Sequence, residues 1–106
     1  MKLMTVAVLV AFAAGCAAAF AAERSIMQKG RVFSESTVSI KKGDTLTFVN
    51  DDNIAHNILS TTSGNEFNLG TQAPGVSTPV TFKTAGDVTV LCAIHPRMKL
   101  LVNVGD

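Results

Sequence analysis

The sequence has little charge, few metal-binding or redox-active residues, and no long helical pattern in most of its length. Charged residues make up 16% of the 106 residues, and the formal net charge is +1. No basic patch suits nucleic acid and no acidic tail is present. Beyond residue 22, no stretch of ten or more residues repeats its apolar positions with a helical period, so strands are expected throughout.

The N-terminal segment is the exception to this pattern. Met1 and Lys2 precede an apolar run, Leu3 to Ala22, which contains small residues in an A-x-A arrangement ending at Ala21. These features are typical of a secretory signal peptide. We therefore predict a signal peptide over residues 1–21, a single domain over 22–106, and export to the periplasm. Two alternatives stay open: an uncleaved membrane anchor, or lipidation of Cys16 in a poor version of a lipoprotein box.

Cysteine is scarce in the predicted mature chain, which retains only Cys92. A disulfide cannot therefore stabilise it, although a domain of this size usually benefits from a covalent or metal cross-link. A lone thiol is also unusual in an oxidising compartment. A metal bound to the thiol would account for both observations.

The rest of the chain reads as about seven short strands separated by turn signals, the pattern of a β-sandwich or small barrel. The turn at 42–44 is expected to make the strands on either side close neighbours. The longest irregular stretch runs from Gly64 to Gly75 and contains Phe67 and Leu69 as apolar anchors. The alternation that predicts strands occurs at 38–40, 45–49, 56–60, 80–82, 88–92 and 100–104.

Four residues with metal-ligating side chains stand out. Cys92, His95 and Met98 follow one another at intervals of three, and His56 begins a separate predicted strand. If the two loops meet at one end of the sandwich, two imidazoles, a thiolate and a thioether converge. Structural zinc prefers cysteine and histidine, and calcium and magnesium prefer oxygen. Two histidines, one cysteine and a weak methionine describe a type 1 (blue) copper site.

Each residue also has a simpler interpretation. Cys92 could be a buried structural thiol, and Met98 could fill space in the core. Cys92 and His95 could form the thiolate–imidazole pair of a thiol enzyme. The sequence shows no orienting partner for such a pair, and a small sandwich with short loops offers little room for a substrate cleft.

Three stretches of the chain resemble the cupredoxins, most closely the amicyanin, pseudoazurin and plastocyanin branch. They are TFVNDDNIAHNI at 47–58, APGVSTPVTFKTAGDVTVLC at 73–92 and CAIHPRM at 92–98. The resemblance implies an all-β, Greek-key β-sandwich of about seven to eight strands. The chain departs from the family at Val90 and Ala55, in having no tryptophan or tyrosine, and in an N-terminal strand that we expect to be short.

The resemblance also implies roles for individual residues. His56, Cys92 and His95 would be equatorial ligands of one copper ion, with Met98 as the long axial ligand, and Asn57 would connect the two ligand loops near the sulfur.

The more exposed imidazole would be that of His95, at an apolar patch including Pro96 and Ala93. Arg97 and Lys99 would form a basic rim around this patch, or would be two ordinary solvated charges.

The function expected from these features is single-electron transfer in the periplasm, without enzymatic activity. The partners would be other redox proteins, such as a dehydrogenase, a cytochrome or a copper reductase, met transiently by a monomer. No nucleic acid is expected, and no membrane unless the N-terminal segment is retained or lipidated. Two alternatives use the same fold: a copper-delivery protein, and a binding module without metal.

Overall fold

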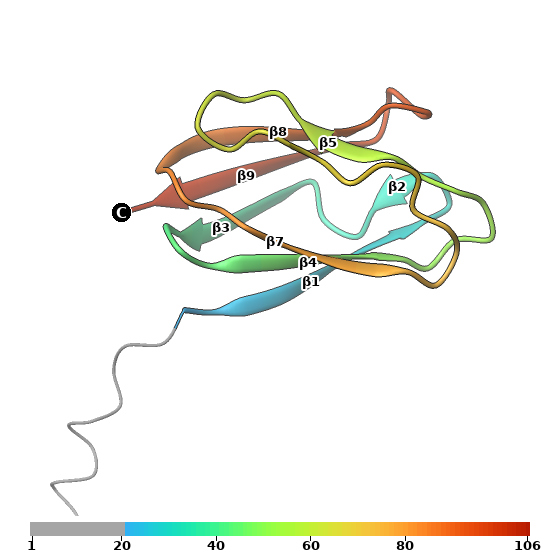
Figure 1. The fold of residues 1–106 in the computed structure, drawn as a ribbon, viewed down its shortest axis with the longest axis horizontal. Helices are drawn as coiled ribbons and strands as arrows, with labels where there is room; N and C mark the ends of the chain where they lie inside the picture. The colour runs from blue at the N-terminus through green and yellow to red at the C-terminus, as the bar shows by residue number, and fades with distance from the viewer. Residues whose placement is uncertain (1–20) are drawn as a thin grey trace, which may run out of the picture.

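Two β-sheets packed face to face make up the part of the chain that the computed structural model describes, residues 21–106 (Figure 1). Among these residues there is no helix, and hence none that could cross a membrane. The predicted signal peptide, its cleavage and the possible lipidation of Cys16 fall on residues that lie almost entirely outside the described part. They therefore stay predictions.

The strands divide between the sheets as four and five. The four-stranded sheet has the order β2-β1-β4-β7, and the five-stranded sheet has the order β3-β9-β8-β5-β6. Most neighbours are not consecutive in sequence, so the chain crosses repeatedly between the sheets, as in a Greek-key sandwich. The strands are β1 Glu23–Lys29, β2 Val32–Phe33, β3 Thr37–Lys41, β4 Thr45–Asn50, β5 Ile58–Ser60, β6 Phe67–Asn68, β7 Ser77–Thr81, β8 Gly86–Cys92 and β9 Lys99–Gly105.

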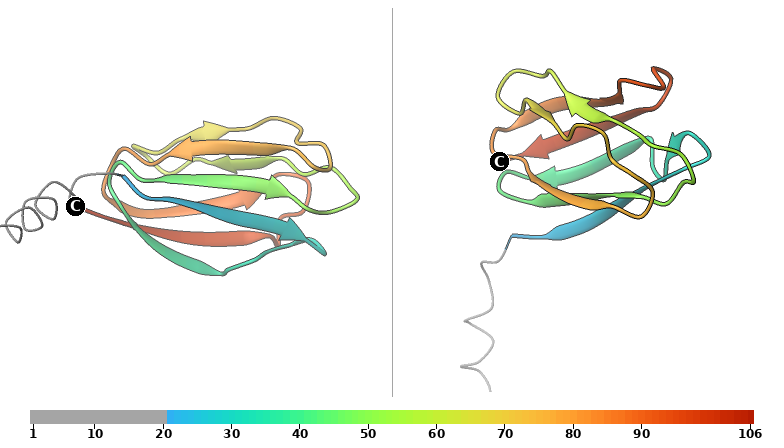
Figure 2. Two further views of the ribbon diagram at one scale, coloured as in Figure 1. Left: turned by 90° about the horizontal axis from the view of Figure 1, so that it is seen from below. Right: turned by 45° about the vertical axis from the view of Figure 1, so that its right-hand side comes forward.

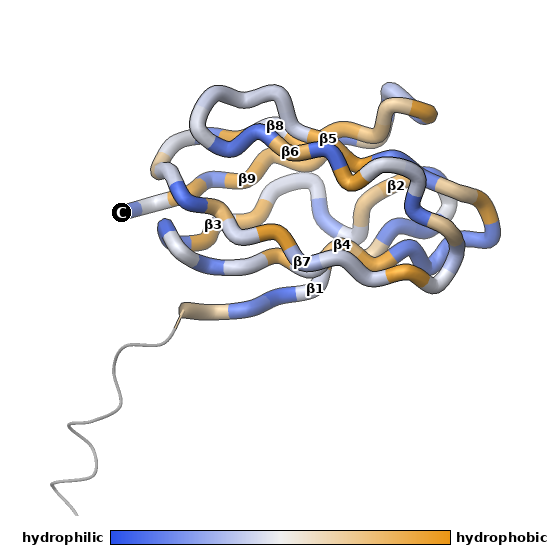
Figure 3. The backbone as a smooth tube through the Cα atoms, in the orientation of Figure 1, coloured by the Kyte–Doolittle hydropathy of each residue, from blue (hydrophilic) through white to orange (hydrophobic). Residues whose placement is uncertain are grey.

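The core follows from the alternation in the sequence. Every second residue of β4, β8 and β9 is buried, and Figure 3 shows apolar and polar residues alternating along the strands. Phe48 and Phe82 are fully buried, and each packs against the ring of Phe67, which confirms Phe67 as an anchor of the irregular stretch. The predicted all-β sandwich is thus confirmed.

Three details of the prediction were wrong. The strands on either side of the turn at 42–44 do not pair: β3 lies parallel to β9, and β4 lies parallel to β1 in the other sheet. The N-terminal strand is not short but has seven residues. The described residues form nine strands, more than the seven to eight expected. The additional strands escaped prediction because β1 and the two-residue strands β2 and β6 have no clear apolar alternation; β1 buries Gln28 as well as Ile26.

Several loops gather at one end of the sandwich, as Figures 1 and 2 show from three directions. The β4–β5 loop (51–57), the β8–β9 loop (93–98) and the β1–β2 turn (30–31) all lie at this end. The C-terminus lies at the opposite end. Because β4 ends at Asn50 and β8 ends at Cys92, the residues that follow them are brought together here.

Candidate metal centre

Cys92 occupies the last position of β8, on the face that points into the sandwich. Its side chain is 1% exposed and shares this face with Val88 and Val90. Antiparallel pairing of β5 with β8 sets Ile58 opposite Cys92. His56, two residues before Ile58 and on the same face, is therefore carried to the thiol.

The ligating atoms of His56, Cys92 and His95 form a triangle. The Cys92 Sγ atom lies 3.8 Å from Nδ1 of His56 and 3.8 Å from Nδ1 of His95, and the two Nδ1 atoms are 3.2 Å apart. A metal about 2.0 Å from each nitrogen and about 2.3 Å from the sulfur would separate trigonal ligands by roughly 3.5 to 3.7 Å. The three donors therefore surround a point where a copper ion fits.

Asp52 determines which nitrogen of His56 faces this centre. Its Oδ2 atom is 2.9 Å from His56 Nε2. This hydrogen bond, followed by one from the Arg31 backbone N–H, lowers the pKa of Asp52 to about 2 from 3.8. The ionised carboxylate can only accept, so His56 Nε2 carries the hydrogen and Nδ1 presents its lone pair to the centre.

Backbone pairing with Gln72 and the buried amide side chain of Asn50 hold the loop that carries His56. The backbones of His56 and Gln72 exchange two hydrogen bonds, of 3.1 Å and 2.7 Å. The Asn50 amide nitrogen donates to the carbonyls of Ile54 and Gln72, both at 2.9 Å. The imidazole is fully buried, so its position is fixed by the fold before any metal binds.

Asn57 connects the two ligand-bearing loops through its backbone. Its N–H donates to Cys92 Sγ at 3.3 Å, and its carbonyl accepts from the Ala93 N–H at 2.9 Å. A donor aimed at the sulfur stabilises negative charge there, as a thiolate ligand requires. The position agrees with the expected role, although the backbone makes these contacts; the side-chain Oδ1 is buried without a partner.

The β8–β9 loop places one candidate ligand at the surface and another in the core. A turn closed by the Met98 N–H donating to the His95 carbonyl at 2.9 Å reverses the chain. His95 is consequently partly exposed, whereas Met98 is 1% exposed and packs within the hydrophobic core. The four predicted residues are thereby brought to one end of the sandwich, positioned as a type 1 copper site.

The surroundings of His95 differ from the expectation in two respects. The apolar residue of the ligand loop that lines the depression beside His95, together with Pro96, is Ile94 and not Ala93. Arg97 and Pro96 line a depression beside His95, as expected, but Lys99 lines a neighbouring depression that also contains Glu35. The side of the His95 depression opposite the ligand loop is formed by Arg31 and Val32.

Several residues around the site were not predicted. Asp52, Gln72, Arg31 and Val32 carry no pattern of their own in the sequence, because their importance depends on contacts between loops distant along the chain. The one available signal was the position of Asp52 four residues before His56.

A cysteine sulfur and two imidazoles at the loop-bearing end of a two-sheet sandwich, with a buried methionine in the same loop, are typical of small copper proteins. Comparison of the chain with known protein families and structures agrees with this class. The family described as copper binding proteins, plastocyanin/azurin family, matches residues 21–105. The chain belongs to this family.

One curated relative and two solved structures illustrate the similarity. The methylamine utilization protein MauL of Methylorubrum extorquens is 38% identical over 65 residues, which are 60% of this chain and 57% of that protein. A reduced Cu(I) form of amicyanin superimposes with a TM-score of 0.71 at 22% identity, covering 86% of this chain and 88% of amicyanin.

The copper-containing nitrite reductase of Thermus scotoductus has a TM-score of 0.73 at 23% identity, covering 79% of this chain and 22% of the enzyme. At such identities the two solved structures show the fold alone. The chain spans little more than half the length of MauL.

Proposed function

We propose that this protein carries single electrons between redox proteins, through one copper ion held by His56, Cys92, His95 and Met98. The first three would be equatorial ligands, and Met98 the weak axial one. Bound copper would supply a one-electron Cu(II)/Cu(I) couple. We also propose that the protein is exported to the periplasm after cleavage behind Ala21 and acts as a monomer.

The observation that supports this proposal most strongly is the triangle of Nδ1, Nδ1 and Sγ atoms at 3.2 to 3.8 Å. The hydrogen bonds of Asp52 to His56 and of Asn57 to Cys92 hold two of these donors in place without metal. A donor set that the fold fixes in advance moves little when the charge of the metal changes, and electron transfer then needs little reorganisation.

Burial of the site favours a carrier over an enzyme. His56, Cys92 and Met98 are each at most 1% exposed, so a substrate has no route to a metal bound between them. The same burial disfavours a thiol enzyme, because the Cys92 sulfur is not accessible as a nucleophile. Of the four residues, His95 alone is partly exposed, which suits transfer of an electron through its ring edge.

The test is to add Cu(II) to the purified protein and record the visible and EPR spectra. We expect an intense blue thiolate-to-copper band with narrow hyperfine splitting, which Cys92→Ser abolishes. Thr89→Ser is a suitable control, because Thr89 lies on the other face of β8. A colourless protein after copper addition would contradict the proposal.

Copper delivery would use the same ligands, and kinetics separates it from electron transfer. A carrier should show a reversible redox couple and fast self-exchange, and should retain copper when challenged with a chelator for hours. Ready transfer of copper to the chelator or to an apo-protein would favour delivery. The burial of His56 and Met98 supports retention of copper by the protein, because a chelator cannot reach these two side chains.

A further inference from the structure

One non-glycine residue in the described part of the chain, Arg31, has a left-handed backbone. Its φ is 60°, and that of the preceding Gly30 is 64°. The two residues form the turn between β1 and β2, where Lys29 pairs with Val32. The favoured two-residue hairpin turn with positive φ at both positions usually contains asparagine, aspartate or glycine. An arginine in this conformation is therefore strained, and residues strained in this way cluster at functional sites.

The strained conformation directs the Arg31 N–H toward a carboxylate on another loop. This N–H donates to Asp52 Oδ2 at 3.1 Å, and the same oxygen accepts from Nε2 of His56 at 2.9 Å. Within residues 21–106, the donors to the Asp52 side chain come from His56 and from the β1–β2 turn alone. The turn therefore supplies the hydrogen-bonding support of this carboxylate that is independent of the imidazole.

Hydrogen bonds on both sides keep the turn and Asp52 together. The Ser34 N–H donates to the Met27 carbonyl at 2.8 Å, and the Ser34 hydroxyl accepts from the Met27 N–H at 3.0 Å, which closes the hairpin. The Asp51 N–H donates to the Gln28 carbonyl at 2.9 Å and so joins the loop that carries Asp52 to β1. Neither the turn nor the loop can move far without breaking one of these contacts.

We infer that the β1–β2 turn is a positioning element of the metal centre, although it contributes no ligand. The Arg31 N–H fixes the Asp52 carboxylate, and the carboxylate fixes the imidazole of His56. Partners of this kind, behind a ligand, orient the ring and raise the affinity for the metal. The inference rests on the proposed copper site and adds a residue outside both ligand loops that controls it.

The backbone of Arg31 carries this role, and its guanidinium does not. The side chain forms no ion pair with any residue in the described part of the chain. The contact with Asp52 is made by the N–H. A test must therefore vary the preference for positive φ at position 31 while the side-chain charge stays the same.

Two variants that both lose the guanidinium differ in this preference. Gly30→Asn/Arg31→Gly introduces Asn-Gly, the sequence that suits such a turn best, and a Cβ at position 30 meets open space. Arg31→Val keeps the N–H but places a β-branched side chain where positive φ is strongly disfavoured. We expect the first variant to hold Asp52 in place and the second to release it.

The metal-free protein gives the first measurement. Exchange of the His56 Nε2–H proton with solvent, followed by NMR, reports on its hydrogen bond with Asp52. We expect exchange about tenfold faster in Arg31→Val than in Gly30→Asn/Arg31→Gly. Equal rates in the two variants would overturn the inference. If Arg31→Val does not fold, the double variant decides alone: its exchange should be slower than in the wild type, and an equal or faster rate would count against the turn.

Copper affinity gives the second measurement. In competition with a chelator, Arg31→Val should bind Cu(II) about tenfold more weakly than Gly30→Asn/Arg31→Gly. Equal affinities would show that the turn does not act on the metal. A blue band absent from the wild type and both variants, with the difference in proton exchange intact, would contradict the copper proposal and leave the positioning of His56 standing.

Gly43→Val is the matched control for backbone strain. Gly43 has a φ of 96°, open space around it, and a place in the turn at 42–44, at the opposite end of the sandwich. This variant should lower the melting temperature of the metal-free protein without faster exchange at His56. Equal acceleration there would mean that Arg31→Val acts only through general stability.

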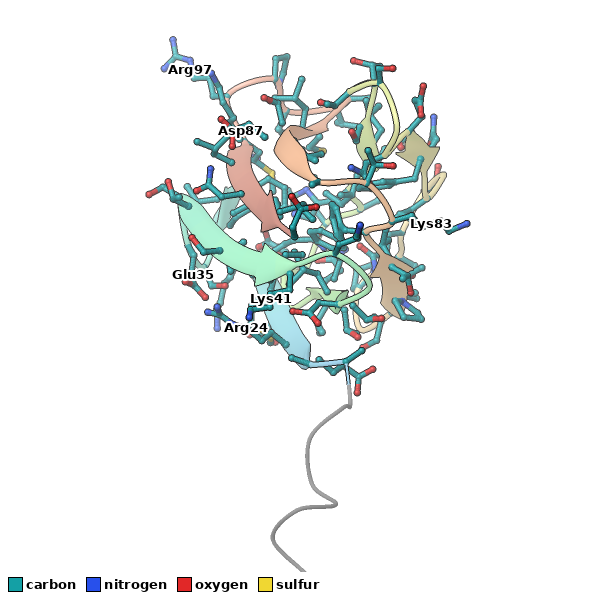
Figure 4. The ribbon with its side chains drawn as sticks, turned by 90° about the vertical axis from the view of Figure 1, so that its left-hand side faces the viewer. Arg24, Glu35, Lys41, Lys83, Asp87 and Arg97 are labelled. Carbon is teal, nitrogen blue, oxygen red and sulfur yellow. The ribbon has the colours of Figure 1, made fainter. Side chains whose placement is uncertain are left out.

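Arg97→Gln is the control for charge at the metal end. Its side chain points away from the sandwich (Figure 4) and makes no contact with Asp52. Loss of this charge should leave the proton exchange of His56 and the affinity for Cu(II) at their wild-type values. Changes as large as those in Arg31→Val would assign the effect to charge and overturn the role of the turn.

Discussion

Asp52 and His56 are joined by a 2.9 Å hydrogen bond between a carboxylate oxygen and Nε2 of a fully buried imidazole. The same oxygen also accepts the backbone N–H of Arg31 at 3.1 Å. A single carboxylate thus orients a candidate copper ligand and anchors the turn that forms half of the depression at His95. It also places a negative charge close to the metal centre.

We predict that Asp52→Asn raises the reduction potential. Asparagine can still accept the hydrogen bond from His56, but it lacks the charge that favours Cu(II) over Cu(I). Loss of such a partner typically lowers metal affinity about 10- to 100-fold. If the affinity for Cu(II) falls tenfold and that for Cu(I) is unchanged, the reduction potential rises by about 59 mV for one electron.

Potentiometric titration of the blue band measures this shift. Asp51→Asn is the control. Asp51 is 54% exposed, and its only ion pair among the described residues is a long, solvent-exposed one of 3.9 Å with the Lys29 ammonium. It should leave the potential nearly unchanged. An unchanged potential in Asp52→Asn would show that the carboxylate acts on the position of the ring and not on its electronics.

A second prediction concerns Met98 as a weak ligand. Met98→Gln replaces a soft thioether with a hard amide oxygen, which favours Cu(II), so the blue colour should survive while the potential falls by about 59 mV or more. Met98→Leu keeps a similar volume without a donor and should not lower the potential. Complete loss of the blue site in Met98→Gln would mean that Met98 is more than a weak axial ligand.

Most of the strands and the candidate ligands could be predicted from the sequence because their patterns are local. Val88, Val90 and Cys92 alternate along one strand, and the three-residue spacing of Cys92, His95 and Met98 lies within one loop. The position of His56 followed from the assumption that two loops meet, and the β5–β8 pairing is what brings them together.

What could not be predicted depends on contacts between distant segments. Residue β-propensity alone could not show that β3 and β4, joined by a short turn, lie in different sheets. Arg31 adjoins the site because Gly30 and Arg31 both adopt positive φ and fold the β1–β2 turn toward Asp52. A non-glycine residue in this conformation is uncommon and leaves no signal in a single sequence.

The third prediction concerns the buried amide of Gln72. Its Nε2 donates to the carbonyls of Phe48 and Val76 and to the Thr78 hydroxyl, and its Oε1 accepts from Gln28 Nε2 at 2.9 Å. Gln72→Leu would leave several buried groups without partners, so we expect a loss of about 2–3 kcal/mol in the free energy of unfolding.

A double-mutant cycle with Gln28→Leu measures how much of this loss of unfolding free energy depends on the hydrogen bond between Gln28 and Gln72. Gln28 is fully buried, and its Oε1 has no partner, so its only side-chain hydrogen bond is with Gln72. The two losses should therefore be less than additive by about 1 kcal/mol, measured by denaturant unfolding at equilibrium. Additive losses would mean that the glutamines act independently.

The last prediction joins acid stability to the processing of the N-terminus. Two backbone N–H groups hold the Asp44 carboxylate: Lys41 donates to Oδ2, and Ala22 donates to Oδ1, both at 2.9 Å. These bonds, that of Lys41 first, lower the pKa of Asp44 below 3.8. The stability that they contribute is therefore complete above about pH 4 and is lost as the pH falls through the lowered pKa.

Asp44→Asn offers only one acceptor oxygen for two donors, so it should lower the melting temperature at pH 7, and the difference should vanish in acid. Asp106→Asn, which loses only an exposed pair with Lys42, should change little. Cleavage behind Ala21 would turn the Ala22 nitrogen into a charged amino terminus 2.9 Å from Asp44 Oδ1. In the exported protein the pKa of this amino group, followed by NMR, should exceed the usual value of about 7.7–8.0 and return to it in Asp44→Asn. An amino terminus with an ordinary pKa in the wild type would place the cleavage elsewhere.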